Sequence, residues 1–232
     1  MLNFYWEIHT ARAENKKLLA ILIDPDKFEE TRTESYLKSI PESTSHIFVG
    51  GSTVENNKTA QTVKAIKAET NLPVFLFPGS HNQISEEADV LLFLSLISGR
   101  NPEYIIGQQV KSVSKLKDSS LEIIPTGYIL IDGGNISAVQ RVSKTDPIPQ
   151  IEIDTIVDTA LAGQYSGQKL IYLEAGSGAK IPVSEEIITA VKKAIDIPLI
   201  VGGGIRSRQQ QKKAYEAGAD MLVMGTHFEE CT

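Results

Sequence analysis

The chain has 232 residues, 41% of them hydrophobic, which suits one folded domain with a sizeable core. Its formal net charge of -6 argues against nucleic acid or an anionic membrane surface as the main partner. The single cysteine, Cys231, excludes an intramolecular disulfide, and no apolar run reaches the length of a transmembrane helix. We therefore expect a single cytoplasmic domain spanning residues 1–232.

Apolar periodicity predicts strands and helices that alternate along the chain. Apolar runs that end in polar or glycine-rich residues are predicted as strands: residues 18–23, 46–49, 74–77, 89–95, 128–131, 170–174, 199–201 and 221–224. Segments with helical spacing of their apolar residues are predicted as helices: residues 3–15, 28–40, 53–69, 101–116, 154–165, 184–194 and 207–217. This order predicts a parallel (β/α)8 barrel with its chemistry at the carboxyl ends of the strands.

Several segments depart from a regular barrel. Residues 78–88, which form the shortened connection between strands three and four, leave room for little more than one helical turn. Pro125-Thr126-Gly127 interrupts the fifth strand and favours its second half as the barrel strand. A polar stretch then runs from Asp132 to about Pro149, and long loops at this end of a barrel are commonly lids. Only eight residues follow Met224, too few for a closing helix, so either the chain is cut short or part of the barrel wall is missing.

The last two predicted strands end in similar glycine-rich sequences. Leu199-Ile200-Val201 runs into three glycines, and the final strand runs into Gly225-Thr226. Two such ends match the phosphate-binding loops of a (β/α)8 barrel, where glycine lets backbone amides approach a phosphate. The alternative is that the glycine triplet is only a tight turn. The predicted phosphate site consists of Gly203, Gly204, Gly225 and Thr226, joined by Gly176, Ser177 and Gly178.

Polar side chains follow three other predicted strands. Asp24 and Ser52 supply a carboxylate and a hydroxyl suited to Mg2+, which is usually completed by water and substrate phosphates. The alternative for Asp24 is a residue of an Asp-Pro turn. Tyr172 and Glu174 are two residues apart and share one face of a strand. Burying a carboxylate at the end of an apolar strand costs free energy unless the carboxylate contacts water or a ligand. Glu174 is therefore the candidate catalytic residue.

These motifs resemble, in order and spacing, the geranylgeranylglyceryl phosphate synthase family, which includes the heptaprenylglyceryl phosphate synthases. The resemblance covers nearly the whole chain, and its most specific part is the segment from tyrosine to glycine in strand six and the loop after it. Some members of the family have a lysine where this chain has Leu22. The segments that carry the resemblance are residues 23–27, 49–53, 172–178, 201–206 and 225–226.

The resemblance implies a Mg2+-dependent prenyltransferase of ether lipid (phospholipid) biosynthesis. It would join a prenyl diphosphate, expected to be geranylgeranyl diphosphate, to the 3-hydroxyl of sn-glycerol 1-phosphate and release diphosphate. Asp24 and Ser52 would bind Mg2+, Glu174 with Tyr172 would be catalytic, and the protein would be a homo-oligomer, either a dimer or a hexamer. The implied glycerol phosphate residues are Tyr172, Leu173, Glu174, Ala175, Gly176, Ser177, Gly178, Gly203, Gly204, Gly225 and Thr226.

A prenyl chain needs an apolar path from the site. Because residues 78–88 leave one sector of the wall thin, we expect a groove that starts near Ser52, passes over Pro78 and Gly79, and uses the helix that begins at Pro102. The alternative is a shortened loop packed by its neighbours.

Two other functions remain open at this point. A sugar-phosphate isomerase or synthase of the same architecture would need a second acid or base opposite the phosphate, and Asp132 is the candidate. A non-catalytic protein that binds a phosphate metabolite would need the glycine-rich phosphate loops but not Asp24.

Overall fold

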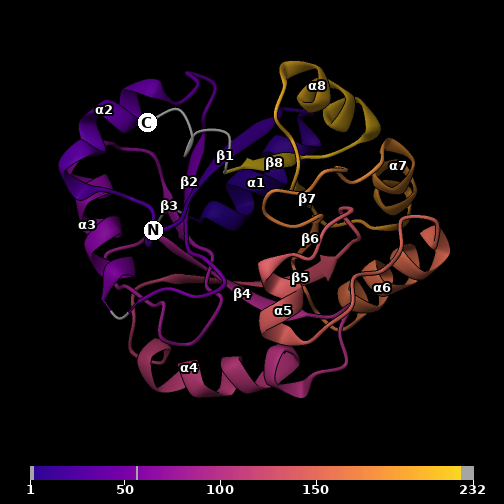
Figure 1. The fold of residues 1–232 in the computed structure, drawn as a ribbon, viewed down its shortest axis with the longest axis horizontal. Coiled ribbons are helices and arrows are strands. Elements are labelled where there is room, and N and C mark those ends of the chain that lie inside the picture. The colour runs from indigo at the N-terminus through magenta and orange to yellow at the C-terminus, as the bar shows by residue number, and fades with distance from the viewer. Residues whose placement is uncertain (1–2, 56, 226–232) are drawn as a thin grey trace.

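The computed structural model describes residues 3–55 and 57–225, and these form a closed barrel of parallel strands in sequential order. Strand β8 pairs with β1, which closes the barrel and confirms the predicted (β/α)8 fold. Figure 1 shows the outer helices arranged around the strands. The strands are β1 Leu18–Ile23, β2 His46–Val49, β3 Val74–Leu76, β4 Val90–Leu96, β5 Glu122–Leu130, β6 Leu170–Glu174, β7 Leu199–Gly202 and β8 Met221–Met224.

The helices differ from the predicted ones mainly at their beginnings. The predicted helix 28–40 is a 3₁₀ turn, Glu30–Arg32, followed by a short α-helix, and the predicted helix 53–69 begins only at Lys58. The predicted helix 101–116 starts with a π-helical turn, Glu103–Gly107. The α-helices are α1 Phe4–Ala13, α2 Thr33–Ser39, α3 Lys58–Glu69, α4 Gln108–Leu116, α5 Ala138–Ser143, α6 Ile153–Tyr165, α7 Glu185–Ala194 and α8 Arg208–Ala217.

The expected interruption of strand five does not occur. Pro125 lies inside the continuous strand β5, in register with Phe93 of β4. Its carbonyl accepts a hydrogen bond from the Lys169 amide at 2.8 Å, so the proline keeps a hydrogen bond to the chain entering β6 although it lacks an N–H of its own. The prediction was wrong because a proline is tolerated in a strand wherever its missing donor is not needed.

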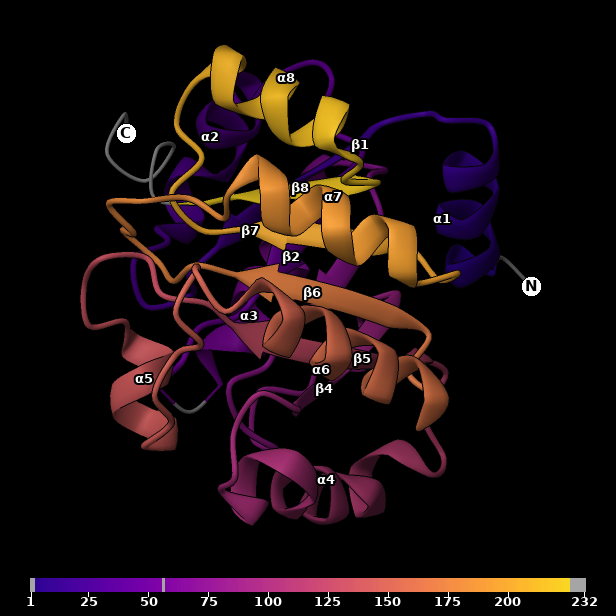
Figure 2. The same ribbon diagram turned by 90° about the vertical axis from the view of Figure 1, so that its right-hand side faces the viewer.

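Helix α1 covers the amino-terminal end of the barrel. Its buried residues are Ile8 and Ala11, and the Glu122 carboxylate at the start of β5 accepts hydrogen bonds from the Phe4 and Tyr5 amides at 2.6 and 2.9 Å. Figure 2 shows α1 at one end of the barrel and α5 at the other. The end that carries α5 is therefore the one open to ligands.

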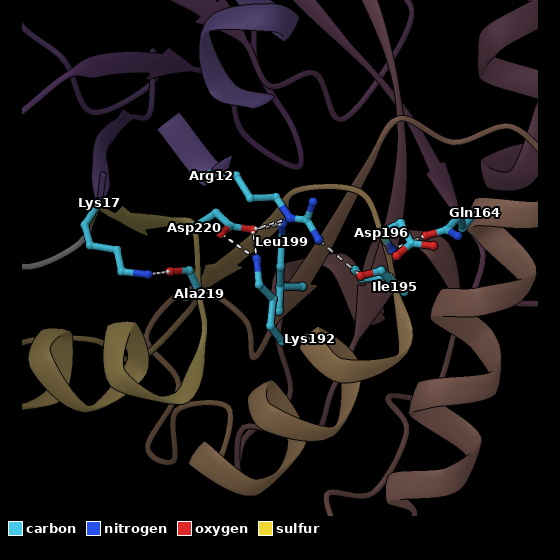
Figure 3. Close-up of polar contacts among 9 residues, drawn as sticks. All are labelled: Arg12, Lys17, Gln164, Lys192, Ile195, Asp196, Leu199, Ala219 and Asp220. Carbon is cyan, nitrogen blue, oxygen red and sulfur yellow. Dashed lines mark hydrogen bonds and ion pairs between the residues drawn. The ribbon is translucent and has the colours of Figure 1, made fainter. Parts of the chain in front are cut away.

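A cluster of charged side chains around the buried Asp220 also belongs to the amino-terminal end (Figure 3). Asp220, at the start of β8, accepts from Lys192 of α7 at 2.6 Å and from the Leu199 amide at 2.8 Å. The Arg12 guanidinium of α1 lies 3.8 Å from the same carboxylate. These contacts join α1, α7, β7 and β8, which fits the structural role that this end of a barrel normally has.

Two apolar layers surround the strands. One fills the barrel interior and includes Phe48, Phe75 and Tyr172; the other lies between the strands and the helices and includes Leu173 and Val201. Neighbouring residues of a strand therefore face different layers, as the period of two requires. Among the described helices, none is long and apolar enough to cross a membrane.

Candidate active site

A polar cavity opens at the carboxyl ends of the strands. Asp24 follows β1, Ser52 follows β2, and Glu174 ends β6, so three loops far apart in sequence converge on one space. This convergence follows from the closed parallel barrel, which places all carboxyl strand ends at one rim. The predicted site residues that line the cavity are Asp24, Ser52, Tyr172, Glu174, Ser177, Gly178, Gly203, Gly204 and Gly225.

Three predicted residues are placed differently. The side chains of Leu173 and Ala175 point into the layer between strands and helices and do not line the cavity, because they alternate with Tyr172 and Glu174 along the strand. Gly176 donates its amide to Glu174 Oε1 at 2.7 Å, so this amide is already engaged within the protein. Thr226 lies outside the described residues.

Glu174 is buried, with only 6% of its surface exposed. Burial raises the pKa of this carboxyl to about 7, because the charged form loses the solvation of water. The Tyr172 hydroxyl and the Gly176 amide act in the opposite direction and favour the carboxylate. A carboxyl with a pKa near neutrality is suited to accept a proton from a bound hydroxyl.

Tyr172 lies beside this carboxylate inside the barrel. Its hydroxyl is buried and has no well-formed hydrogen bond among the described residues. A buried hydroxyl without a partner is costly, so a ligand hydroxyl or water at this point would stabilise the site. Burial and the Glu174 charge both raise the pKa of Tyr172, which keeps its proton at neutral pH.

Gly203 shows why glycine follows β7. Its φ of +84° is one that side chains rarely adopt, and an added Cβ would lie 2.5 Å from Glu174 Oε1 and 2.7 Å from the Gly176 amide nitrogen. The chain can bring the loop after β7 against the loop after β6 only where no side chain intervenes. Gly203 and Gly204 are thus more than a turn, since both line the cavity.

Asp24 and Ser52 occupy neighbouring strand ends, as predicted. Asp24 accepts a hydrogen bond from the Asp26 amide at 3.1 Å, and Lys27 Nζ lies 3.7 Å from its other oxygen. Among the described residues there is no cluster of three or more histidine, cysteine, aspartate or glutamate side chains. One carboxylate and one hydroxyl facing a cavity still fit Mg2+, which commonly takes few protein ligands and is completed by substrate phosphates.

An apolar cavity adjoins the polar one, in the sector where a groove was predicted. It passes Ser52, Pro78 and Gly79, runs along β4, and reaches the Tyr104 side of the helix that follows. Its position depends on the connection between β3 and β4, which contains no helix. Residues Gly51, Ser52, Phe77, Tyr128 and Val139 line both cavities.

The sequence alone did not identify several cavity residues. Phe77 and Tyr128, which were not predicted, form an aromatic cluster with the predicted Tyr172 at the junction, with ring centroids 5.2 Å apart for Phe77 and Tyr172 and 5.3 Å for the two tyrosines. The cations Lys27, Arg141 and Arg206 also line the polar cavity. Lys27 and Arg206 stand within the quoted motifs, whereas nothing in the sequence singles out Arg141.

Comparison with known proteins gives the family. The sequence model of the PcrB family matches residues 11–232. The chain belongs to the PcrB family. This agrees with the resemblance of the sequence motifs. Leu22, the position at which some members of the family have a lysine, lines the polar cavity with an apolar side chain.

Two curated relatives, from a bacterium and an archaeon, have the name geranylgeranylglyceryl phosphate synthase. The protein of Zunongwangia profunda is 61% identical over 215 residues, covering 93% of this chain and 92% of its own. That of Pyrococcus furiosus is 46% identical over 220 residues, covering 94% and 87%. The solved structure of (S)-3-O-geranylgeranylglyceryl phosphate synthase from Thermoplasma acidophilum, in complex with its substrate sn-glycerol-1-phosphate, is 38% identical with a TM-score of 0.90 and covers 99% of this chain and 92% of its own.

Proposed function

We propose that this protein forms the ether bond between a prenyl diphosphate and the 3-hydroxyl of sn-glycerol 1-phosphate, with release of diphosphate and dependence on Mg2+. The observation that carries the proposal is the shared wall between a polar cavity that holds a carboxylate and an apolar cavity open along β4. A substrate pair with one small phosphate ester and one lipid fits these two spaces. The family and the named relatives make the chain a prenyltransferase of the geranylgeranylglyceryl phosphate synthase type.

The glycerol phosphate half of the site is assigned to the loops after β6, β7 and β8. Ser177, Gly178 and Gly204 line the cavity there, and Gly204 has a φ of +74°, which turns its peptide groups in a way that side chains rarely allow. Backbone amides at such positions can hold a phosphate without a dedicated cation. Gly203 and Gly225 complete this wall, and Thr226 remains a predicted contact.

Glu174 and Tyr172 are assigned to the reacting hydroxyl. With the phosphate held at the glycine loops, the 3-hydroxyl can reach Glu174, whose pKa of about 7 lets it take the proton as the new C–O bond forms. The Tyr172 hydroxyl, which has no well-formed hydrogen bond among the described residues, would hydrogen-bond the same substrate oxygen and fix its direction. Anchoring one end of glycerol and activating the other accounts for the regiochemistry.

The prenyl half of the site is assigned to Asp24, Ser52 and the apolar cavity. Mg2+ bound there would stabilise the negative charge that develops on the departing diphosphate. The chain of the lipid would lie along β4 and toward Tyr104, held by burial worth about 0.8 kcal/mol for each CH2 group. A geranylgeranyl chain is the substrate that we expect, by analogy with the named relatives.

The two alternative functions receive less support. An isomerase would use Asp132 as a second acid or base, but its carboxylate accepts from the Gly134 amide at 2.8 Å and the residue does not line the polar cavity. A phosphate binder without catalysis would not need an apolar cavity that reaches Ser52 and Tyr128. Both observations favour transfer of a lipid group.

The direct test is turnover. The purified protein is incubated with Mg2+, sn-glycerol 1-phosphate and a series of prenyl diphosphates, and ether product and free diphosphate are both measured. We expect equal amounts of the two products, with loss of turnover when a chelator removes Mg2+ and with sn-glycerol 3-phosphate a poor substrate. Absence of ether product with every prenyl diphosphate would refute the proposal.

A further inference from the structure

Helix α5 lies at the boundary between the polar and apolar cavities. Ala138, Val139 and Arg141 line the polar cavity, whereas Val139 and Val142 line the apolar one. The helix belongs to the long connection after β5 and begins at Ser137, whose side chain accepts from the Gln140 amide at 3.1 Å. It therefore presents one cation to the place where a prenyl diphosphate would pass from apolar to polar surroundings.

The helix is fixed to the barrel at its end. The Asn101 side chain donates to the Ser143 carbonyl at 2.8 Å, and Ile131 forms a parallel bridge with Ile148 beyond the helix. These contacts join the segment to the loop after β4 and to the end of β5. The direction from which Arg141 approaches the cavity is consequently set by the fold.

The three cations that line the polar cavity have different partners. Lys27 lies 3.7 Å from the Asp24 carboxylate, and Arg206 donates to the Ala179 carbonyl at 3.0 Å. Arg141 is exposed and donates through Nη1 to the Ile136 carbonyl at 3.1 Å. Within the described part of the chain no carboxylate pairs with Arg141, so its charge is not neutralised by the protein.

We propose that Arg141 binds the diphosphate of the prenyl donor from the α5 side of the cavity that Asp24 and Ser52 also line. The inference rests on the proposed function, since it identifies how the same site holds its leaving group. A guanidinium is suited to this task because its planar donors can bind two phosphate oxygens at once. The neighbouring Val139 and Val142 would contact the first carbons of the prenyl chain.

The role of Arg141 follows from the movement of charge in the reaction. When the allylic C–O bond breaks, its electron pair leaves with the diphosphate oxygen, and the glycerol oxygen forms the new bond to the same carbon. The glycerol proton passes to Glu174. The charge on the diphosphate rises during this step, and a fixed guanidinium beside it stabilises the transition state more than the ground state.

The test uses two substitutions at this site and one control. Arg141→Gln removes the charge, Arg141→Lys keeps it without the bidentate geometry, and Lys144→Gln removes a charge just after α5 that does not line either cavity. We expect Arg141→Gln to raise the KM for prenyl diphosphate roughly tenfold or more and to lower kcat. Arg141→Lys should recover part of both effects, whereas Lys144→Gln should match the wild type.

Binding measurements separate this inference from the proposed function. Calorimetry with inorganic diphosphate and Mg2+ should show weaker binding to Arg141→Gln, and titration with sn-glycerol 1-phosphate should show unchanged affinity. Unchanged diphosphate binding, or a loss confined to glycerol phosphate, would overturn the role of Arg141. If the wild type binds diphosphate through Arg141 but makes no ether with any prenyl diphosphate, the proposed function is wrong. The role of Arg141 in binding diphosphate would nevertheless be supported.

Discussion

The phenol of Tyr172 lies directly against Gly202. An added Cβ at this glycine would be 3.0 Å from the ring carbon Cζ of Tyr172 and closer still to the hydroxyl, and 2.8 Å from Glu174 Oε2. The last residue of β7 must therefore lack a side chain for the tyrosine and the carboxylate of β6 to share the end of the barrel. This packing relationship leads to the first prediction.

Gly202→Ala should displace Tyr172 and Glu174 together. We expect loss of most turnover and a destabilisation of about 1–3 kcal/mol, the usual cost of forcing a methyl group into a filled space. Denaturant unfolding and steady-state kinetics measure the two effects. The double variant Gly202→Ala with Tyr172→Phe should regain part of the stability because the hydroxyl is gone. If the double variant is as unstable as the sum of the single variants, the clash is not with the hydroxyl.

Glu174→Gln should change how stability depends on pH. The folded-state pKa of about 7 lies above the ordinary value of 4.5, so the folded protein holds a proton that the unfolded chain releases between these pH values. Stability should therefore fall as pH rises from 4.5 to 7, by up to about 3 kcal/mol. Glu174→Gln removes this loss and should raise Tm at pH 8 but not at pH 4.5, while turnover is lost. An equal change in Tm at both pH values would contradict the shifted pKa.

Asp24→Ala should separate catalysis from binding of the acceptor. Because Asp24 belongs to the diphosphate half of the proposed site, we expect turnover to be abolished and sn-glycerol 1-phosphate binding to be largely retained. Gly204→Val should weaken sn-glycerol 1-phosphate binding, because the valine side chain would meet the Ala179 carbonyl and the φ of +74° is strained for valine. Calorimetry with glycerol phosphate compares the two. If Asp24→Ala lost sn-glycerol 1-phosphate binding and kept activity, the assignment of Asp24 to the diphosphate half of the site would be wrong.

Ser112→Phe should shorten the preferred prenyl chain. Ser112 is a buried residue of α4 that lines the apolar cavity, so a larger side chain there would occupy the far part of the groove. Gly79 is unsuitable for this purpose because an added Cβ would meet the Gly51 carbonyl and lie 2.8 Å from the Ser52 carbonyl oxygen, next to the proposed metal site. Product analysis with a mixture of prenyl diphosphates measures the preference. An unaltered chain-length profile would tell against this cavity as the lipid site.

The protein should be a homo-oligomer. Ile106, Val110 and Val113 are 56%, 65% and 51% exposed along the outer helix that follows β4, and such apolar surface commonly forms symmetric contacts. Sedimentation should give a dimer or a larger closed assembly. Val110→Asp should shift the equilibrium toward smaller species, and a monomer for the wild type at micromolar concentration would refute the prediction.

The sequence by itself determined the barrel and most of the rim. Runs such as Leu18–Ile23 and Met221–Met224 are apolar on both faces, which is required of parallel strands covered inside and outside, and the polar residues that follow such strands are forced to one rim. Asp24, Ser52, Glu174 and Gly203 could be placed there because strand ends and alternation are local properties of the chain. The sequence also predicted that no outer helix follows β3, because residues 78–88 are too few to form one.

Only the tertiary structure decided which side chains meet. The pKa of Glu174 depends on burial by neighbouring strands, and the close packing of Tyr172 depends on Gly202 of β7, a different segment. Arg141 lines the cavity from α5, a helix whose end is held by the loop after β4, a contact between residues distant in sequence. Pro125 remained in its strand because hydrogen bonds to neighbouring segments, not local propensity, settle whether a proline is tolerated. Such outcomes depend on contacts across the barrel, and no local pattern encodes them.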